Sequence, residues 1–230
     1  MNKEIKTSTF SSALAYERMC QPRADRFLQE KYPDKNIRRP DYRKGGQDKE
    51  LQLADVDVVI SNKEGWPNEW YISEKFRTKP WHDVLIEFWS NYDEKKPGWA
   101  FNTISHEHHI YYSDVRTNSD GEVTKDDSFL RIIPTWAIKR AAQTFKPFID
   151  PIIHDMYVSG VHHREVDLMG YHVTVIINMT FGSDNEVLYF SAAAAIDKQY
   201  FRDINADIKE IKTAQYATVN RKTDTGTGNR

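Results

Sequence analysis

The stretch from residue 51 to residue 91 constrains the chain most, because acidic residues lie inside segments that otherwise read as buried β-strands. Three apolar, β-branched or aromatic runs, at 53–60, 70–77 and 84–90, are separated by turn-forming segments such as the one around Gly65 and Pro67. A carboxylate buried without a partner costs several kcal/mol. Acids within such strands therefore need a partner, and a metal ion is the commonest good one.

The alternation of side chains along a strand predicts which of these charged residues meet. Asp55 and Asp57 share one side of the first run, Lys75 lies opposite the apolar side of the second, and Glu87 does so in the third. If the apolar sides pack together, Asp57, Lys75 and Glu87 converge on one side of a sheet. Carboxylates hold Mg²⁺ or Mn²⁺, the metal lowers the pKa of a bound water, and a lysine stabilises charge on a phosphate or positions the attacking water.

These residues resemble the PD-(D/E)XK nuclease superfamily, in a branch that is frequent in phages and mobile elements. The similar features, in order, are an Asp in a hydrophobic run, the Glu74-Lys75 pair, a later strand acid and the Gly98-Trp99 pair. The resemblance covers roughly residues 11–114. In it, Asp57 matches the metal-binding Asp and Lys75 matches the motif lysine.

The resemblance implies a metal-dependent deoxyribonuclease, with endonuclease and exonuclease cleavage both open and with Mg²⁺ or Mn²⁺ as cofactor. One position departs from the family pattern: Ser73 stands two residues before Lys75, where the family has an acid. The alternative is therefore a nuclease-like protein that has lost activity and binds DNA or a host protein, as a phage-type interaction protein would.

Two acids are candidates to complete the site in place of Ser73. A regular strand directs Glu74 away from Lys75, where its charge needs a partner of its own, whereas a β-bulge at 73–74 would turn Glu74 inward. Glu87 needs no such distortion and ranks first as a metal ligand on geometry. Glu17, on the helix predicted to begin after Ser11, is a further candidate, although a solvated helix charge is the favoured interpretation.

Contacts to DNA are expected from a basic segment, because the formal net charge of −2 provides no global basic field. The segment 35–49 is polar, Gly-rich and without periodicity, which predicts a loop. Arg38, Arg39, Arg43 and Lys44 make it a candidate for phosphate-backbone contacts, with Arg77 as an additional one. A solvated loop explains the same residues equally well, and nothing distinguishes duplex from single-stranded DNA.

The order of the expected elements predicts an α+β fold: a nuclease-like core with a central mixed β-sheet flanked by helices, plus a C-terminal β-hairpin and helix. Residues 1–148 are expected to form the core, with a helix beginning near 134. Residues 149–212 are expected to extend the same domain with a hairpin at 171–196 and a helix at 196–211, which reads substrate or mediates a homodimer. Residues 213–230 are expected to be disordered.

The expected location is the cytoplasm. The single cysteine, Cys20, excludes an intramolecular disulfide, and no apolar run is long enough for a membrane span or a signal peptide. His106, His108 and His109 are dense in sequence, but their spacing fits no closed zinc site and no cysteine lies near. Membrane contact is therefore not expected, and Mg²⁺ or Mn²⁺ remains the expected metal.

Overall fold

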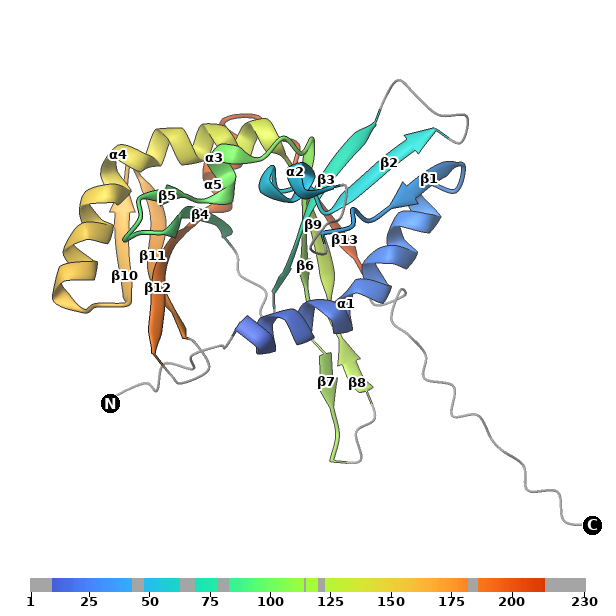
Figure 1. Ribbon diagram of the computed structural model, residues 1–230, viewed down its shortest axis with the longest axis horizontal. Coiled ribbons are helices and arrows are strands. Elements are labelled where there is room, and N and C mark those ends of the chain that lie inside the picture. Colours follow the sequence, from blue (N-terminus) through green and yellow to red (C-terminus); the bar gives the residue numbers. More distant parts are fainter. Residues whose placement is uncertain are drawn as a thin grey trace, which may run out of the picture.

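The computed structural model describes residues 10–42, 48–62, 69–77, 83–113, 115–119, 123–181 and 186–213. Within these residues the strands form a six-stranded sheet, a five-stranded sheet and a small two-stranded sheet, with helices packed against the two large ones (Figure 1). The predicted α+β class, with a mixed central sheet flanked by helices, is confirmed. None of the helices among the described residues combines the length and apolar character needed to cross a membrane.

The six-stranded sheet carries most of the predicted site. Its order is β1 (Lys35–Arg38), β2 (Val58–Asn62), β3 (Trp70–Arg77), β6 (Glu107–Tyr112), β9 (Phe129–Pro134) and β13 (Lys209–Lys212). All neighbours are antiparallel except β3 and β6, which are parallel. A parallel pair needs a long crossover connection. Here the crossover runs through the second sheet and brings that sheet against the site.

Helix α1 (Phe10–Lys31) covers one face of this sheet (Figure 1). Ala24, Phe27 and Leu28 are buried on it, in one cluster with Ile60 and Ile72 of the sheet. The helix is continuous through Pro22. A proline removes one backbone donor, and this helix tolerates the loss.

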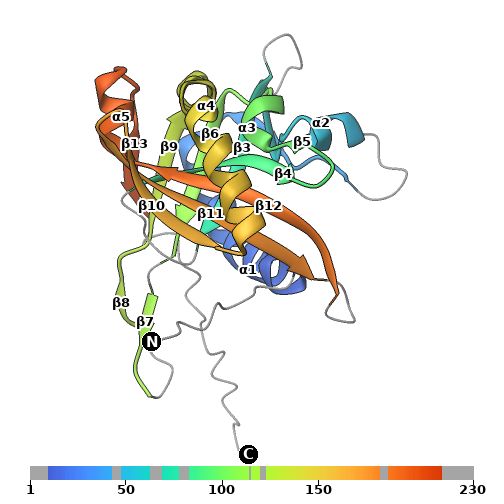
Figure 2. The ribbon, with the colours of Figure 1, turned by 90° about the vertical axis from the view of Figure 1, so that its left-hand side faces the viewer.

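The five-stranded sheet has the order β10 (His163–Leu168), β11 (Tyr171–Phe181), β12 (Val187–Ile196), β4 (Val84–Asn91) and β5 (Lys96–Pro97). Helix α4 (Thr135–Ser159) packs along it, and the short helix α3 (Trp99–Asn102) follows β5 (Figure 2). Phe88, Phe145 and Ile149 are fully buried between them. The alanine run of β12 pairs with β4.

Several predicted boundaries need correction. The strand predicted at 53–60 begins only at Val58, because helix α2 (Lys49–Leu53) precedes it and Asp55 adopts a left-handed conformation with φ of 57°. The predicted loop at 35–49 starts with strand β1, which pairs with β2. The predicted helix at 196–211 is helix α5 (Lys198–Asp203) followed by β13, with Asn205 at φ 56° between them. Short polar side chains tolerate this left-handed region, so a helix readily ends there.

Two further expectations concern other parts of the chain. The polar segment after β6 contains two paired antiparallel strands, β7 (Val115–Thr117) and β8 (Val123–Asp126). Thr213, placed in the predicted disordered tail, is buried, and its backbone N–H donates to the Ser128 carbonyl at 2.9 Å. Residues 214–230 of that predicted tail lie outside the described residues.

Candidate active site

Asp57 and Lys75 lie side by side where β2 separates from β3. The Asp57 backbone N–H still donates to the Ile72 carbonyl at 2.9 Å, and the Asp57 carboxylate then accepts from the Glu74 N–H at 2.7 Å. The side chain thus takes over as acceptor at the point where the strand pairing ends. Lys75 Nζ is 3.7 Å from Asp57 Oδ2, so the two residues share one side, as the alternation predicts.

Asp55 is the closest partner of Lys75, at 2.6 Å between Oδ1 and Nζ. The sequence pattern ranks Asp57 above it; the only signal for Asp55 is its place two residues earlier on the same side. Its left-handed backbone is fixed by a hydrogen bond from the Ser105 hydroxyl to its carbonyl at 2.7 Å. Sparsely populated backbone conformations are often found at functional sites. We therefore include Asp55 in the candidate site.

The protonation states follow from burial and from the charges around Lys75. Burial alone favours a neutral amine, but the carboxylates of Asp55 and Asp57 hold the pKa of Lys75 above its usual value. Burial raises the pKa of Asp57, with a further increase from Asp55, while Lys75 opposes the shift. Burial and the charge of Asp57 likewise raise the pKa of Glu17. The carboxylates here repel one another, so the site favours an additional cation.

A cavity of about 270 Å³ opens beside this group. It runs along the free edge of β3, which is why consecutive residues of that strand contribute to it, and it is lined by Glu17, Asp57, Glu74, Lys75, Phe76 and Arg77. Glu17 reaches it from helix α1. The solvated-charge interpretation of Glu17 is therefore incomplete, since its side chain contributes to the cavity wall.

Arg77 supplies an uncompensated positive charge to this cavity. Among the described residues its guanidinium has no ion pair or hydrogen bond, and its buried Nε has no partner. Burial lowers the pKa of Arg77, and Tyr112 and Glu87 oppose this shift. An unpaired guanidinium presents a planar set of donors, which suits the oxygens of a phosphate or a carboxylate.

Glu74 points to the opposite face of β3, as a regular strand requires. The pairing of β3 with β6 runs without interruption from Ser73↔His108 through Lys75↔Ile110, so the proposed β-bulge at 73–74 does not occur. The Glu74 side chain is 1% exposed and binds the Arg39 guanidinium at 2.6 Å. Burial raises its pKa to about 7 despite this partner. Glu74 thus has its own counterion on the α1 side of the sheet.

Glu87 belongs to β4 and approaches the site from the other sheet. Its carboxylate accepts a hydrogen bond from the Trp99 N–H at 3.2 Å, and the Trp99 ring lies 5.3 Å from Lys75 Nζ. Gly98 makes this contact possible, because a Cβ there would lie 2.1 Å from the Glu87 carbonyl oxygen. Burial raises the pKa of Glu87, whereas the Trp99 N–H and then Lys75 lower it. Glu87 therefore borders the site but does not line the cavity.

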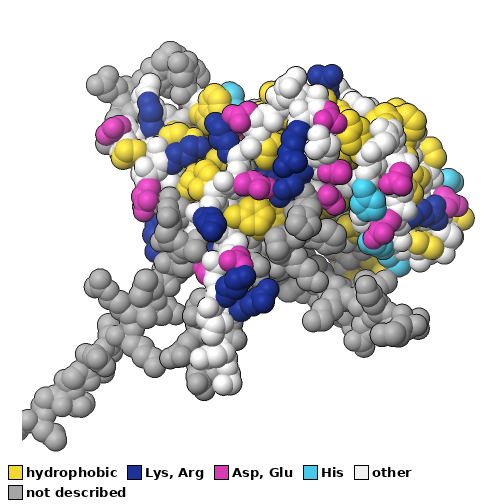
Figure 3. All heavy atoms as spheres, turned by 180° about the vertical axis from the view of Figure 1, so that it is seen from behind, with side chains coloured by type: hydrophobic (Ala, Val, Ile, Leu, Met, Phe, Trp, Pro, Cys, Tyr) yellow, Lys and Arg dark blue, Asp and Glu magenta, His cyan; other side chains and the backbone are white. Residues whose placement is uncertain are grey.

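The predicted DNA-contact residues are placed differently from one another. Arg38 is on the surface, paired with Asp48 at 3.0 Å, whereas Arg39 turns inward to Glu74 and Asp25. Arg39 was predicted either to contact DNA phosphates or to be solvated; it binds two carboxylates instead, because the buried Glu74 carboxylate needs its charge. Arg43 and Lys44 lie outside the described residues. On the face shown in Figure 3, basic and acidic side chains of the described residues are interspersed.

The histidines after α3 are mainly structural. His108 and His109 are fully buried on β6, and burial lowers the pKa of His108 to about 3. The His108 ring packs on Trp99 at 4.8 Å between ring centroids, and His108 Nδ1 lies 4.0 Å from Asp55 Oδ2. Within the part of the chain that the structure describes, no group of three or more His, Cys, Asp or Glu residues is arranged to hold a metal.

No family model, curated protein or solved structure matches this chain. Function is therefore inferred from the geometry and charge of the site itself.

A pair of conservative substitutions separates the two candidate acids. If the site cleaves DNA with a bound metal, as the sequence resemblance implies, Glu87→Gln should lower the cleavage rate by about 10–100-fold, the range typical of residues that orient a metal site without binding the metal. We expect Glu74→Gln to leave the rate within about twofold, because Glu74 is engaged with Arg39 on the other face. Initial rates on one DNA substrate at saturating Mg²⁺ compare them. A dead Glu74→Gln with a fully active Glu87→Gln would reverse this assignment.

Proposed function

We propose that the protein is a metal-dependent nuclease that hydrolyses DNA phosphodiester bonds with Mg²⁺ or Mn²⁺. The observation that carries the proposal is the Asp57–Lys75 pair, 3.7 Å apart, on the wall of a cavity that also contains the unpaired Arg77. A metal-binding acid, a protonated lysine and a free guanidinium are what phosphodiester hydrolysis needs: an ion site, stabilisation of developing charge and a phosphate contact.

The residues present suit Mg²⁺ rather than a metal held entirely by protein ligands. Mg²⁺ is usually bound through one or two carboxylates and keeps several waters. Only Oδ2 of Asp57 has a hydrogen-bond partner among the described residues, which leaves Oδ1 for a metal. Glu17 lines the same cavity, and the raised pKa of both acids indicates that a cation there would relieve repulsion. Asp57 and Glu17 would hold the ion, with Glu87 as the more distant acid.

Each remaining residue has one role in this proposal. Bound Mg²⁺ would lower the pKa of a coordinated water and so supply the nucleophile at neutral pH. Lys75, kept protonated by Asp55 and Asp57, donates to the phosphate oxygen on which charge develops. Arg77 binds a second phosphate oxygen and orients the substrate. The Trp99 ring, which packs on His108, lies against Lys75 and excludes water from that side of the ammonium group.

A non-catalytic nuclease-like protein that binds DNA or a host protein is the second candidate. The observation in its favour is that Lys75 is closer to Asp55 than to the cavity acid Asp57, while the motif position of the second acid is Ser73, which is fully buried. Such a protein would bind DNA through Arg77 without cutting it. The cytoplasm is the proposed location for either activity.

Cleavage with and without metal tests the proposal directly. Supercoiled plasmid, a linear duplex and a single-stranded oligonucleotide are incubated with the purified protein in Mg²⁺, Mn²⁺ or EDTA. We expect metal-dependent cleavage of at least one substrate, and plasmid nicking would identify an endonuclease. DNA binding with no cleavage in any metal would favour the second candidate, and neither binding nor cleavage would overturn both.

Arg77 provides a prediction about substrate binding that holds for both candidates. We expect Arg77→Gln to weaken DNA binding alike on all sequences, and to reduce the slope of log affinity against log salt by about 1, because one phosphate contact is lost. Fluorescence anisotropy at several salt concentrations measures both. The matched control is Arg116→Gln, which removes an exposed charge from the β7–β8 hairpin. Equal effects of the two substitutions would remove Arg77 from the proposed site.

A further inference from the structure

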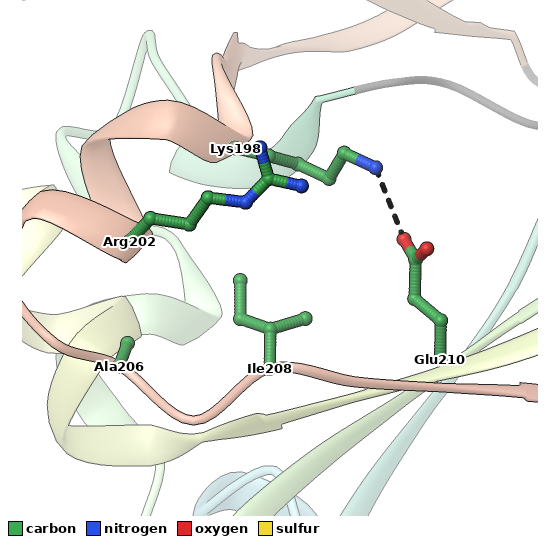
Figure 4. Close-up of a pocket in the computed structure, with 5 residues that line it drawn as sticks. All are labelled: Lys198, Arg202, Ala206, Ile208 and Glu210. Carbon is green, nitrogen blue, oxygen red and sulfur yellow. Dashed lines mark hydrogen bonds and ion pairs between the residues drawn. The ribbon is translucent and has the colours of Figure 1, made fainter.

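A second basic pocket lies between helix α5 and strand β13, away from the candidate active site. Its volume is about 150 Å³, and its lining residues are Lys198, Arg202, Ala206, Ile208 and Glu210. Figure 4 shows the two basic side chains extending side by side from the helix over Ile208, with Glu210 on the facing strand. The pocket therefore has an apolar floor and charged walls.

Positive charge exceeds negative charge around this pocket. The Glu210 carboxylate is already bound by the fully buried Arg131 guanidinium, at 2.9 Å from Nε and 2.7 Å from Nη2. The same carboxylate is the partner of Lys198, at 3.2 Å. Arg202 is exposed and has no side-chain ion pair or hydrogen bond among the described residues. Glu210 is thus shared between two cations, and Arg202 adds a further positive charge to the pocket.

The excess charge is held in place by the fold. Lys198 is only 21% exposed, so its ammonium is partly withdrawn from water. The Lys209–Asp207 pair next to the pocket is neutral overall, at 3.3 Å, and does not offset the excess. Lys198 is thus partly desolvated while Arg202 is solvated, and a bound anion would give both cations a further partner.

We propose that the α5–β13 pocket binds a phosphate group. A phosphate offers several acceptor oxygens, which match the planar donors of Arg202 and the point charge of Lys198 together. The volume admits one such group rather than a nucleobase with its sugar. The phosphate can come from a nucleic-acid backbone or from free phosphate, and both sources present the same oxygens to the pocket.

The pocket is related to the candidate active site by the sheet register. Glu210 pairs with Arg131, Arg131 with Ile110 and Ile110 with Lys75, so these residues form one row across the six-stranded sheet. Three strand spacings separate Glu210 from Lys75, which is about 14 Å. Ile110 in the middle of the row is buried, so the two cavities are separate. Binding at the pocket does not depend on nuclease activity.

The test compares two ligands on matched variants of the full chain. Thermal unfolding is measured in sodium phosphate and in sodium chloride of equal ionic strength, and binding of a short oligothymidylate is measured by anisotropy over a range of salt. For the wild type we expect a higher melting temperature in phosphate than in chloride, or salt-dependent oligonucleotide binding, depending on the source.

The variants decide whether the pocket is responsible. We expect Lys198→Gln/Arg202→Gln to abolish the phosphate-specific increase or to weaken oligonucleotide binding about tenfold or more, with Arg116→Gln unchanged. If the double variant does not fold, Arg202→Gln alone serves, because that side chain has no ion pair to lose. If the substitutions change only the phosphate-dependent melting temperature, the ligand is free phosphate. If they change oligonucleotide binding, the ligand is the nucleic-acid backbone. No difference between the double variant and Arg116→Gln with either ligand overturns the proposal.

Discussion

Lys75→Met is expected to slow Mg²⁺-dependent DNA cleavage by about 10²–10³-fold, the range observed when one preorganised donor to a developing charge is removed. The lysine is protonated and fixed by two carboxylates, so its charge is in place before the substrate arrives. Asp57→Asn is expected to cost at least as much, because it removes the carboxylate proposed to hold the metal. Single-turnover cleavage at saturating DNA measures both rates. In a metal titration, only Asp57→Asn should need a higher Mg²⁺ concentration to reach half of its maximal rate.

Controls separate lost chemistry from lost folding. Lys75 is half-buried beside Asp55 and Asp57, so its loss also destabilises the fold, and circular dichroism must show native structure at the assay temperature. Lys125→Met removes an exposed lysine from the β7–β8 hairpin and should cleave normally. Lys75→Arg keeps the charge and should recover part of the rate. Wild-type cleavage by a folded Lys75→Met would place the active site elsewhere.

Arg39→Met is expected to lower the free energy of unfolding by about 3–5 kcal/mol at pH 8, because it leaves the buried Glu74 carboxylate without its counterion. The effect should be smaller at pH 5. The pKa of Glu74 in the folded protein, about 7, lies above its usual value of 4.5, so the folded state binds this proton more tightly than the unfolded chain does. The contribution of Glu74 to stability therefore falls as pH rises from 4.5 to 7.

The neighbouring arginine is a matched control for this prediction. Arg38 is 41% exposed and paired with Asp48 at the surface, so Arg38→Met should cost less than about 1 kcal/mol. Adding Glu74→Gln to Arg39→Met should restore stability at pH 8, because the unpaired charge is removed. Urea unfolding at pH 5 and pH 8 measures all four proteins. Equal losses for Arg38→Met and Arg39→Met would show that the Arg39–Glu74 pair has no special role.

The residues of the candidate site were predictable where local alternation decides the outcome. The pattern in residues 70–77 predicted strand β3 with its bounds, the proximity of Lys75 to Asp57, and a separate counterion for Glu74. The left-handed turn at Asp55, and with it the closest partner of Lys75, was not predicted, because an aspartate tolerates that conformation without any mark in the sequence.

Long-range pairing was less predictable. The strand carrying Glu87 was expected beside the strand carrying Lys75, but it pairs with the alanine run of β12, about a hundred residues later. Alternation shows which face of a strand is buried and not which strand lies next to it. For the same reason the ion pair of Arg39 was not predicted: its partner Glu74 is remote in sequence, and a run of basic residues does not reveal which one folds inward.

Strand β12 belongs to the five-stranded sheet and β13 to the six-stranded sheet, and both are made late in translation. All proposed catalytic residues precede residue 100, yet one edge of β4 gains its partner only when β12 has been made, and one edge of β9 only when β13 has. During translation the emerging chain therefore exposes two unpaired strand edges while its catalytic residues are already outside the ribosome. Such edges are prone to intermolecular association. Chaperone dependence and insolubility are thus expected of any truncated form that ends near residue 148, whereas a form that ends after Thr213 retains every described strand.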